Sequence, residues 1–351
     1  MNRVFFFIVF AVALLPLQGC IGLGYYAETA NGHLELLAAR EPVDEIRADA
    51  SAPAPLRSQM GTAAEMRQFA VEVLKLPDNA SYQSYVDVGR EYVSVAVFAA
   101  PEFSLQPAAW CFPIFGCVPY RAFFWEDNAR KTAEQLSEQG FDVYVTGVTA
   151  YSTLGWTADP ILNTMLNYGD AHLAAVMFHE LAHQQVYVRN DAAFNEAFAV
   201  TVEIEGVKKW FRAKGDTKAL AEYELSRQRQ RDFLDLLDET RASLSEVYAS
   251  GTSDASKREG KARAIEKMRA RYRQMRNHQW HGFDGYDGWF ARPLNNAQLA
   301  ASGIYNDLVP DFQNLFRSCG EDFSRFYAAA EKLTKRPLDE RRLALKQANC
   351  A

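Results

Sequence analysis

Two histidines four residues apart, His179 and His183, constrain the fold of this chain more than any other feature. On an α-helix, residues with this spacing lie on one face, about 6 Å apart along the axis, so both imidazoles can reach one metal ion. Glu180 lies about 100° around the helix from His179, where it can act on a water molecule without displacing it. The HELAH stretch therefore predicts a helix that carries two metal ligands and a general base.

A third ligand is expected on the next helix, because a catalytic zinc ion takes three protein ligands and keeps one position open. Asn190 and Asp191 should end the first helix and cap the second, which places Glu196 in its first two turns, folded back toward the histidines. Glu203 and Glu205 are competitors, and Glu203 could instead form an ion pair or orient a ligand. The alternative is a pair of partly exposed surface histidines, which an apolar helix disfavours.

The first twenty residues are predicted to lie outside the fold. A positive start, Met1–Arg3, precedes an unbroken apolar run and the sequence LQGC, which resembles the lipobox of bacterial lipoproteins. The run is short for a membrane-spanning helix. We therefore expect removal of the signal and lipidation of Cys20, palmitate included, with an uncleaved anchor or ordinary signal as the alternative. Ile21 replaces the aspartate that retains such proteins on the inner membrane, which favours the outer membrane, facing the periplasm.

Four further cysteines are expected to form two disulfides, because an even number of cysteines besides Cys20 in an exported chain favours pairing. Cys111 and Cys117 bracket CFPIFGC, whose proline and glycine favour a tight loop. Cys319 with Cys350 would then fasten the C-terminus, although three pairings are open. A structural zinc site on these cysteines is disfavoured, since neither pair has CxxC spacing.

Composition indicates a globular protein and limits its partners. With 48% hydrophobic residues the chain can bury a real core. A net charge of −6 without a concentrated basic patch argues against nucleic acid. The expected partners are a peptide or protein substrate and the membrane through the lipid on Cys20; the sequence does not decide the oligomeric state.

The pattern along the chain predicts an α+β protein, mostly helical with a small mixed sheet. YVDVGREYVSVAVFAA and FDVYVTGVTAYS are typical of strands, and Asp170 is expected to cap the helix of the two histidines. Residues 217–277 contain two long charged helices joined by GTSD, which predicts an antiparallel hairpin, more a solvated arm than a partner-binding element. The expected regions are a signal peptide at 1–19, a helical region at 20–80, a core with strands and the HELAH helix at 81–216, the hairpin at 217–277 and a helical region at 278–351.

Several blocks together resemble a known family: LQGC, WCFPIFGCVPYR, YSTLGWTADPILNTML, FHELAHQ, FNEAFA, and PLNNAQLA followed by Tyr305. The sequence resembles the bacterial aminopeptidases of the Aminopep family, zinc-dependent lipoproteins related to the gluzincins. The resemblance implies a zincin-like metallopeptidase fold into which the hairpin is inserted. It also implies one Zn²⁺ ion on His179, His183 and Glu196, with catalysis by Glu180.

Two departures from thermolysin-like enzymes concern the groups around the ligands. His183 and Glu196 are closer in sequence than in those enzymes, and Val200 stands where they carry an aspartate that orients a histidine. An orienting group must therefore come from elsewhere, and Glu203 and Asp170 are the candidates.

Other site residues are predicted from their place in the chain. The oxyanion needs a stabilising group besides the metal, and the candidates are Tyr305, His278, His281 and Tyr151. An extended substrate can pair with an edge strand before the HELAH helix. The residues expected to contact it there are Thr153, Leu154 and Gly155.

The predicted function is zinc-dependent peptide hydrolysis, most simply by an aminopeptidase. Such an enzyme needs an acidic group for the substrate's ammonium, and Glu203, Glu205 or Asp159 could serve. The hairpin could lean over the cleft and restrict it to chain ends. The alternatives are an endopeptidase, a cell-wall peptide hydrolase, or a metal-free zincin-fold scaffold or binding lipoprotein, the last disfavoured by the intact HELAH and Glu196.

Overall fold

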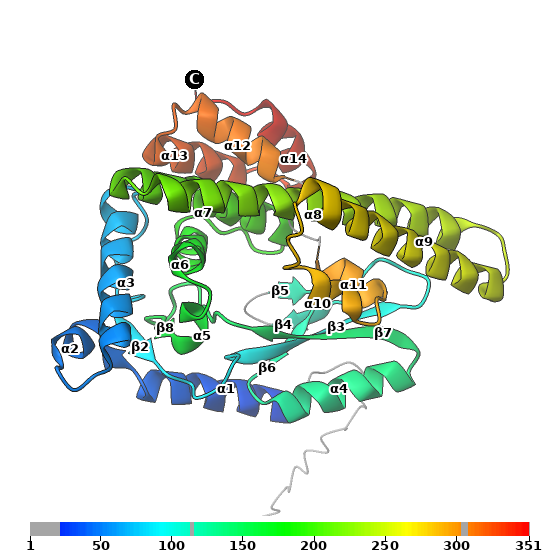
Figure 1. Cartoon of the computed structure of the whole chain (residues 1–351), viewed down its shortest axis with the longest axis horizontal. Helices are drawn as coiled ribbons and strands as arrows, with labels where there is room; N and C mark the ends of the chain where they lie inside the picture. The colour runs from blue at the N-terminus through cyan, green and yellow to red at the C-terminus, as the bar shows by residue number, and fades with distance from the viewer. Residues whose placement is uncertain (1–21, 113–115, 303–307, 351) are drawn as a thin grey trace, which may run out of the picture.

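The computed structural model describes residues 22–112, 116–302 and 308–350 and shows an α+β protein, mostly helical with small sheets (Figure 1). The predicted signal peptide and Cys20 lie outside these residues. Within the described ranges, no helix has the length and apolar character needed to cross a membrane. The described chain opens with the helices α1 (Leu23–Ala38), α2 (Val43–Ala48) and α3 (Ala54–Glu72).

The larger sheet has the strand order β6–β3–β7, with both pairings antiparallel. Val95 and Val97 of β3 pack on the side of α4, whereas Ala96 and Phe98 pack on the side of α11. This alternation places the two helices on opposite faces of the sheet. The bounds of these elements are β3 (Ser94–Pro101), β6 (Arg121–Phe123), α4 (Glu126–Glu138), β7 (Phe141–Val148) and α11 (Asn296–Ala301).

Shorter strands complete the β structure. In the second sheet β2 is antiparallel to β1 and parallel to β8, so that this sheet is mixed. Strands β4 and β5 form a separate antiparallel hairpin. The bounds are β1 (Glu41–Pro42), β2 (Ser84–Val86), β4 (Trp110–Phe112), β5 (Gly116–Val118) and β8 (Ile161–Leu162).

Helices α6 (Asp170–Gln185) and α7 (Ala192–Lys214) form the centre of the main core, preceded by the short α5 (Asn163–Leu166). Phe178 of α6 and Phe198 of α7 are fully buried there. The prediction that Asp170 caps α6 is wrong: Gly169 occupies the cap position, and Asp170 is the first helical residue. Its carboxylate there still favours the helix, because the N-terminus carries partial positive charge.

Helices α8 (Thr217–Ala249) and α9 (Asp254–Gln274) lie side by side and extend to the right in Figure 1. A four-residue connection joins them, and Gly260 leaves so little room that a β-carbon there would meet Val247 at 2.7 Å. A second hydrophobic cluster binds this pair to the segment that follows, which contains η1 (Met275–Gln279) and α10 (Asp287–Ala291).

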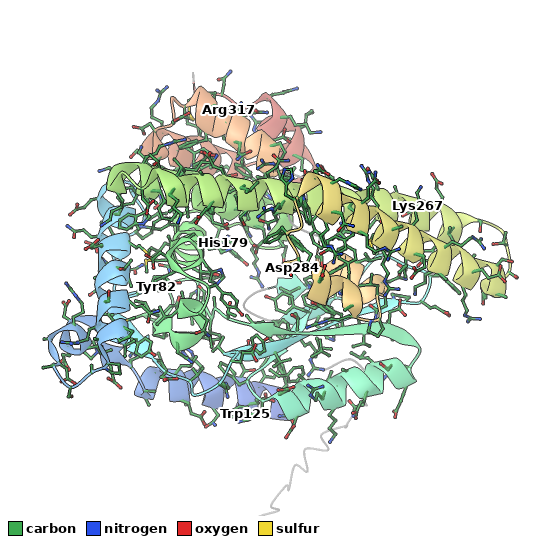
Figure 2. All side chains as sticks on the ribbon, viewed as in Figure 1. Tyr82, Trp125, His179, Lys267, Asp284 and Arg317 are labelled. Atoms are coloured by element: carbon green, nitrogen blue, oxygen red, sulfur yellow. A yellow bond between two sulfur atoms is a disulfide. The ribbon has the colours of Figure 1, made fainter. Side chains whose placement is uncertain are left out.

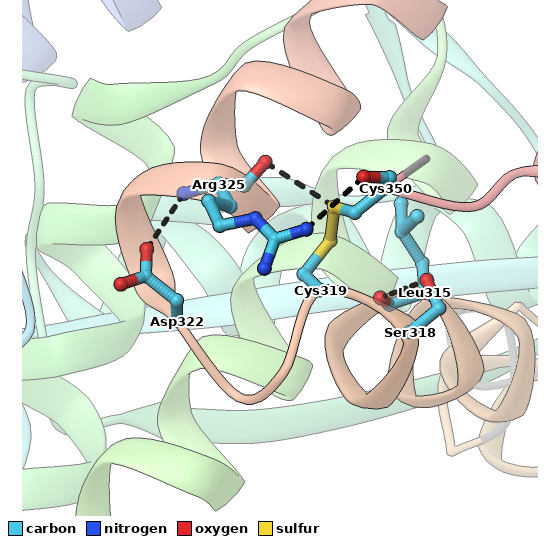
Figure 3. Close-up of a disulfide and its surroundings, with 6 residues drawn as sticks. All are labelled: Leu315, Ser318, Cys319, Asp322, Arg325 and Cys350. Carbon is cyan, nitrogen blue, oxygen red and sulfur yellow. Dashed lines mark hydrogen bonds between the residues drawn. A yellow bond between two sulfur atoms is a disulfide. The ribbon is translucent and has the colours of Figure 1, made fainter.

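The C-terminal helices lie above α7 in Figure 1 and contribute buried side chains to the main core. The structure joins Cys319 to Cys350 and Cys111 to Cys117, the pairing that the sequence favoured. Figure 3 shows Arg325 beside the C-terminal disulfide, where it donates a hydrogen bond to the carbonyl oxygen of Cys350 at 3.1 Å. The helices are α12 (Val309–Ser318), α13 (Phe323–Thr334) and α14 (Leu338–Gln347).

Candidate metal centre

The two histidines of α6 and Glu196 of α7 bring three ligand atoms together. The Nε2 atoms of His179 and His183 are 3.2 Å apart. The Glu196 carboxylate lies 3.3 Å from Nε2 of His179 and 3.6 Å from Nε2 of His183. One ligand atom from each residue can be chosen so that all lie within 4.8 Å of one another. Figure 2 shows His179 on α6; its side chain is 17% exposed and that of Glu196 is 31% exposed, so the site is partly open to solvent.

A firmly held turn between α6 and α7 folds Glu196 back over the histidines. The side chain of buried Asn195 accepts a hydrogen bond from the N–H of Val188 and donates one to its carbonyl oxygen, both at 2.8 Å. Asp191 caps α7 by accepting a backbone N–H of its first turn at 3.2 Å. Because Asn195 is locked to the turn, the next residue, Glu196, has little freedom to move away from the histidines.

The donor set fits a zinc ion. Without a metal ion, the two Nε2 atoms that face each other at 3.2 Å must share one hydrogen, and Nδ1 of His183 has no partner among the described residues. Two imidazoles and one carboxylate around a single point are a common ligand set of catalytic zinc sites, which leave a fourth position open.

Electrostatics also favour positive charge at this point. Burial opposes the charged form of His179, but hydrogen bonds to Glu196 and Glu203 outweigh it and raise the pKa of His179 well above its usual value. Burial and the charge on His179 lower the pKa of His183 to about 4. The two imidazoles thus hold one positive charge between them, which a metal ion would replace.

Glu180 differs from the ligands in its surroundings. Burial raises the pKa of its carboxyl, the charge of His179 opposes this increase, and the charge of Glu196 adds to it. A hydrogen bond from Ser152 favours the ionised form and lowers the pKa. The net rise brings the pKa of Glu180 closer to neutrality, which suits a group that must take up and return a proton.

Glu203, one of the two candidates for orienting a ligand, contacts His179 directly. Its Oε2 lies 3.1 Å from Nδ1 of His179, and its Oε1 accepts a hydrogen bond from Arg227 of α8 at 3.2 Å. The other candidate, Asp170, is exposed in the first turn of α6. Nδ1 of His183 is buried and has no hydrogen-bond partner among the described residues. The two histidine ligands are therefore supported unequally.

The residues predicted to contact substrate belong to a folded loop ahead of α6. Thr153 is buried and donates its hydroxyl to Asp159 at 2.6 Å and its N–H at 3.1 Å. Leu154 and Gly155 both have positive φ, and a β-carbon at Gly155 would come 3.1 Å from the side chain of Gln184. The loop thus lies against the end of α6 beside His183, while the polar groups of Thr153 turn inward to Asp159.

Three of the candidates for stabilising the oxyanion lie in the described part of the chain, and none of these three forms a hydrogen bond to a ligand side chain there. His278 and His281 are exposed, in η1 and in the turn after it. The hydroxyl of Tyr151 lies 3.3 Å from Nδ1 of His33, on α1. Tyr305 lies outside the described residues, so its role stays a prediction.

The β4–β5 hairpin reaches the turn between the two ligand helices. The disulfide between Cys111 and Cys117 closes this hairpin. A β-carbon at Gly116, whose φ is +78°, would come 2.2 Å from Oδ1 of Asn190. This close approach requires glycine at position 116. The disulfide-bonded hairpin therefore packs directly against the α6–α7 turn.

Two tyrosines near the carboxylates were not predicted. The pKa of Tyr120 is raised to about 12, by burial first and then by the charges of Glu196 and Glu180. The ring of Tyr187 lies 6.4 Å from that of His183, and burial and Glu196 raise its pKa. Both hydroxyls therefore stay protonated at neutral pH and can donate hydrogen bonds. In the sequence, the only signal for Tyr120 is its place directly after the disulfide-bracketed loop.

Comparison with known proteins identifies a family. A family model described as "Putative aminopeptidase" (Aminopep) matches residues 24–345. No significant match is found among curated proteins or among solved structures. The matched range covers nearly the whole chain, including both ligand helices and the α8–α9 pair.

Proposed function

The chain belongs to the Aminopep family, and from this membership and the geometry of the site we propose that it is a zinc-dependent peptidase with a zincin-like fold. The observation that carries the proposal is the convergence of ligand atoms from His179, His183 and Glu196 within 4.8 Å. A metal-free scaffold has no use for a carboxyl group with a raised pKa beside these ligands, and Glu180 is such a group.

His179, His183 and Glu196 would hold one Zn²⁺ ion, which when bound activates water and polarises a carbonyl group. Glu180 accepts the proton of the attacking water and passes it to the leaving nitrogen. Tyr120, whose pKa is raised by burial and by the charges of Glu196 and Glu180, is the candidate donor of a hydrogen bond to the developing oxyanion.

The family description supports an aminopeptidase, but a specific observation favours cleavage within chains as the second candidate. An aminopeptidase requires an acidic group to bind the free ammonium of its substrate. Protein groups already engage each of the acids predicted for that role, Glu203, Glu205 and Asp159. Unless another carboxylate serves, the site would accept peptides with blocked N-termini.

We base a proposal for the cellular location of this activity on the LQGC motif. LQGC and the apolar run before it support cleavage ahead of Cys20 and acylation of its thiol and amino group. Each buried methylene contributes roughly 0.8 kcal/mol, so several acyl chains would hold the enzyme firmly on the membrane. We place it on the outer membrane, facing the periplasm. The two disulfides agree with an oxidising compartment.

The test measures bound zinc and peptide hydrolysis in the same preparations. His179→Ala should lose the metal, whereas Glu180→Gln should keep it and lose at least about 10²-fold in turnover, because Glu180 serves the water and not the ion. Glu222→Gln, an exposed substitution of the same kind on α8, should match the wild type. Full activity of Glu180→Gln would exclude the mechanism. Peptides with free and acetylated N-termini, compared on the wild type, separate the two candidate activities.

A further inference from the structure

Helix α8 returns along α7 and reaches the group that supports a metal ligand. Arg227 and Glu203 are equally far along the chain from Gly215, the residue that ends α7, and their hydrogen bond fixes the two helices side by side. The two side chains are 13% and 15% exposed, so the contact is largely shielded from water. An ion pair in such surroundings is screened much less by salt than one on the surface.

The contacts form a continuous chain from α8 to the metal site. The Arg227 guanidinium donates to Oε1 of Glu203 at 3.2 Å, and Oε2 of Glu203 lies 3.1 Å from Nδ1 of His179. A hydrogen on Nδ1 leaves the lone pair of Nε2 free for a metal ion. Because both Glu203 oxygens are engaged, its carboxylate has a fixed orientation, and it fixes the ring of His179.

Within the described ranges, the guanidinium of Arg227 is only partly hydrogen-bonded. Its Nε atom is buried without a hydrogen-bond partner among the described residues, as is the hydroxyl of Tyr223 one turn earlier on α8. Glu205, the next acid along α7, bonds instead to Lys208 and to Gln313 of α12. The hydrogen bond to the Glu203 carboxylate explains why a buried arginine occupies this position although its guanidinium is only partly hydrogen-bonded.

We propose that Arg227 is a positioning residue for the metal centre, which orients His179 through Glu203 and couples the α8–α9 pair to metal binding. The inference rests on the proposed zinc site. The coupling is reciprocal, so zinc should also hold α8 against α7. Nδ1 of His183 has no partner of this kind in the part of the chain that the structure describes, so α8 would act on the metal centre through His179.

The test is a double-mutant cycle read out as zinc affinity, measured by competition with a chromogenic chelator. Arg227→Met and Glu203→Gln should each weaken zinc binding by about 10- to 100-fold, the loss expected when an outer partner of a metal ligand is removed. In the Glu203→Gln background, Arg227→Met should cause little further loss. Arg227→Lys should retain part of the affinity because it keeps the charge. The control is Arg231→Met, an exposed arginine one turn further along α8.

The outcomes separate the two proposals. If the wild type does not bind zinc, the proposed function itself is refuted. If the wild type binds zinc and Arg227→Met binds it with the same affinity, the role of Arg227 is refuted but the proposed function is not. Equal losses from Arg227→Met with and without Glu203 would also overturn it, since that result describes a general packing effect. Protection of α8 amides from hydrogen exchange on adding zinc, absent in Glu203→Gln, would support the coupling.

Discussion

The turn that carries the third ligand depends on a buried ion pair with the C-terminal helices, and this pair allows a sharp test of stability. Arg341 of α14 donates a hydrogen bond to Asp191, the residue that caps α7. Their side chains are 7% and 3% exposed. Arg341 also donates to the carbonyl oxygens of Arg336 at 2.8 Å and Leu333 at 3.3 Å. One guanidinium thus connects two parts of the chain that lie far apart in sequence.

Replacing Arg341 by methionine removes the ionic partner of the buried Asp191 carboxylate and leaves its capping bond in place. Removing one partner of a buried ion pair costs about 3–5 kcal/mol, a large share of the roughly 5–15 kcal/mol that stabilises a typical domain. Asp191→Asn retains a capping group, and in the double variant no buried charge is left alone. We therefore expect the double variant to be more stable than Arg341→Met alone.

Urea unfolding of the metal-free protein with its disulfides intact measures these free energies. The matched control is Arg342→Met, the exposed neighbour on α14, which should stay within about 0.5 kcal/mol of the wild type. Equal losses in Arg341→Met and Arg342→Met would refute the reasoning, as would a double variant less stable than either single one.

Further predictions concern the site and the anchor. Tyr120→Phe should lower turnover by about 10²-fold with zinc content unchanged, as expected for the loss of one donor to an oxyanion; unchanged turnover would remove Tyr120 from the mechanism. Burial raises the pKa of folded Glu180 above its usual 4.5, so its ionised form costs stability above that pH. In zinc-free protein, Glu180→Gln should therefore melt at a higher temperature than the wild type, by a margin that grows as pH rises from 4.5 and then levels off; a constant margin across pH would contradict this. Cys20→Ala should abolish metabolic labelling with a fatty acid, and equal labelling of both proteins would exclude the anchor.

Local patterns were enough to predict the parts of the site that depend on helix geometry. The spacing of His179 and His183 places both on one face of α6, and the cap at Asp191 sets the start of α7, so Glu196 arrives beside them. The sequence left three cysteine pairings open, but it favoured the pair six residues apart, because so short a loop closes easily.

The groups that support these residues could not be predicted in the same way. Arg227 reaches Glu203 across a helix–helix contact, and Arg341 reaches Asp191 from a helix near the C-terminus. On their own helices these arginines resemble other charged residues, and only the packing of distant segments distinguishes them. The bonds of Thr153 to Asp159 lie within one loop, six residues apart, and its predicted contact with substrate stays a prediction.

The ligand helices are thus held by segments that come from three separate parts of the chain: the β4–β5 hairpin at Gly116, α8 at Arg227 and α14 at Arg341. This arrangement changes how the role of residues 217–277 must be tested. Deleting them to open the cleft would also remove Arg227 and expose the cluster that α8 and α9 share with α10, so lost activity would say nothing about access. Substitutions on the distal half of the α8–α9 pair, which leave Arg227 in place, are the ones that can reveal whether it limits the substrate to chain ends.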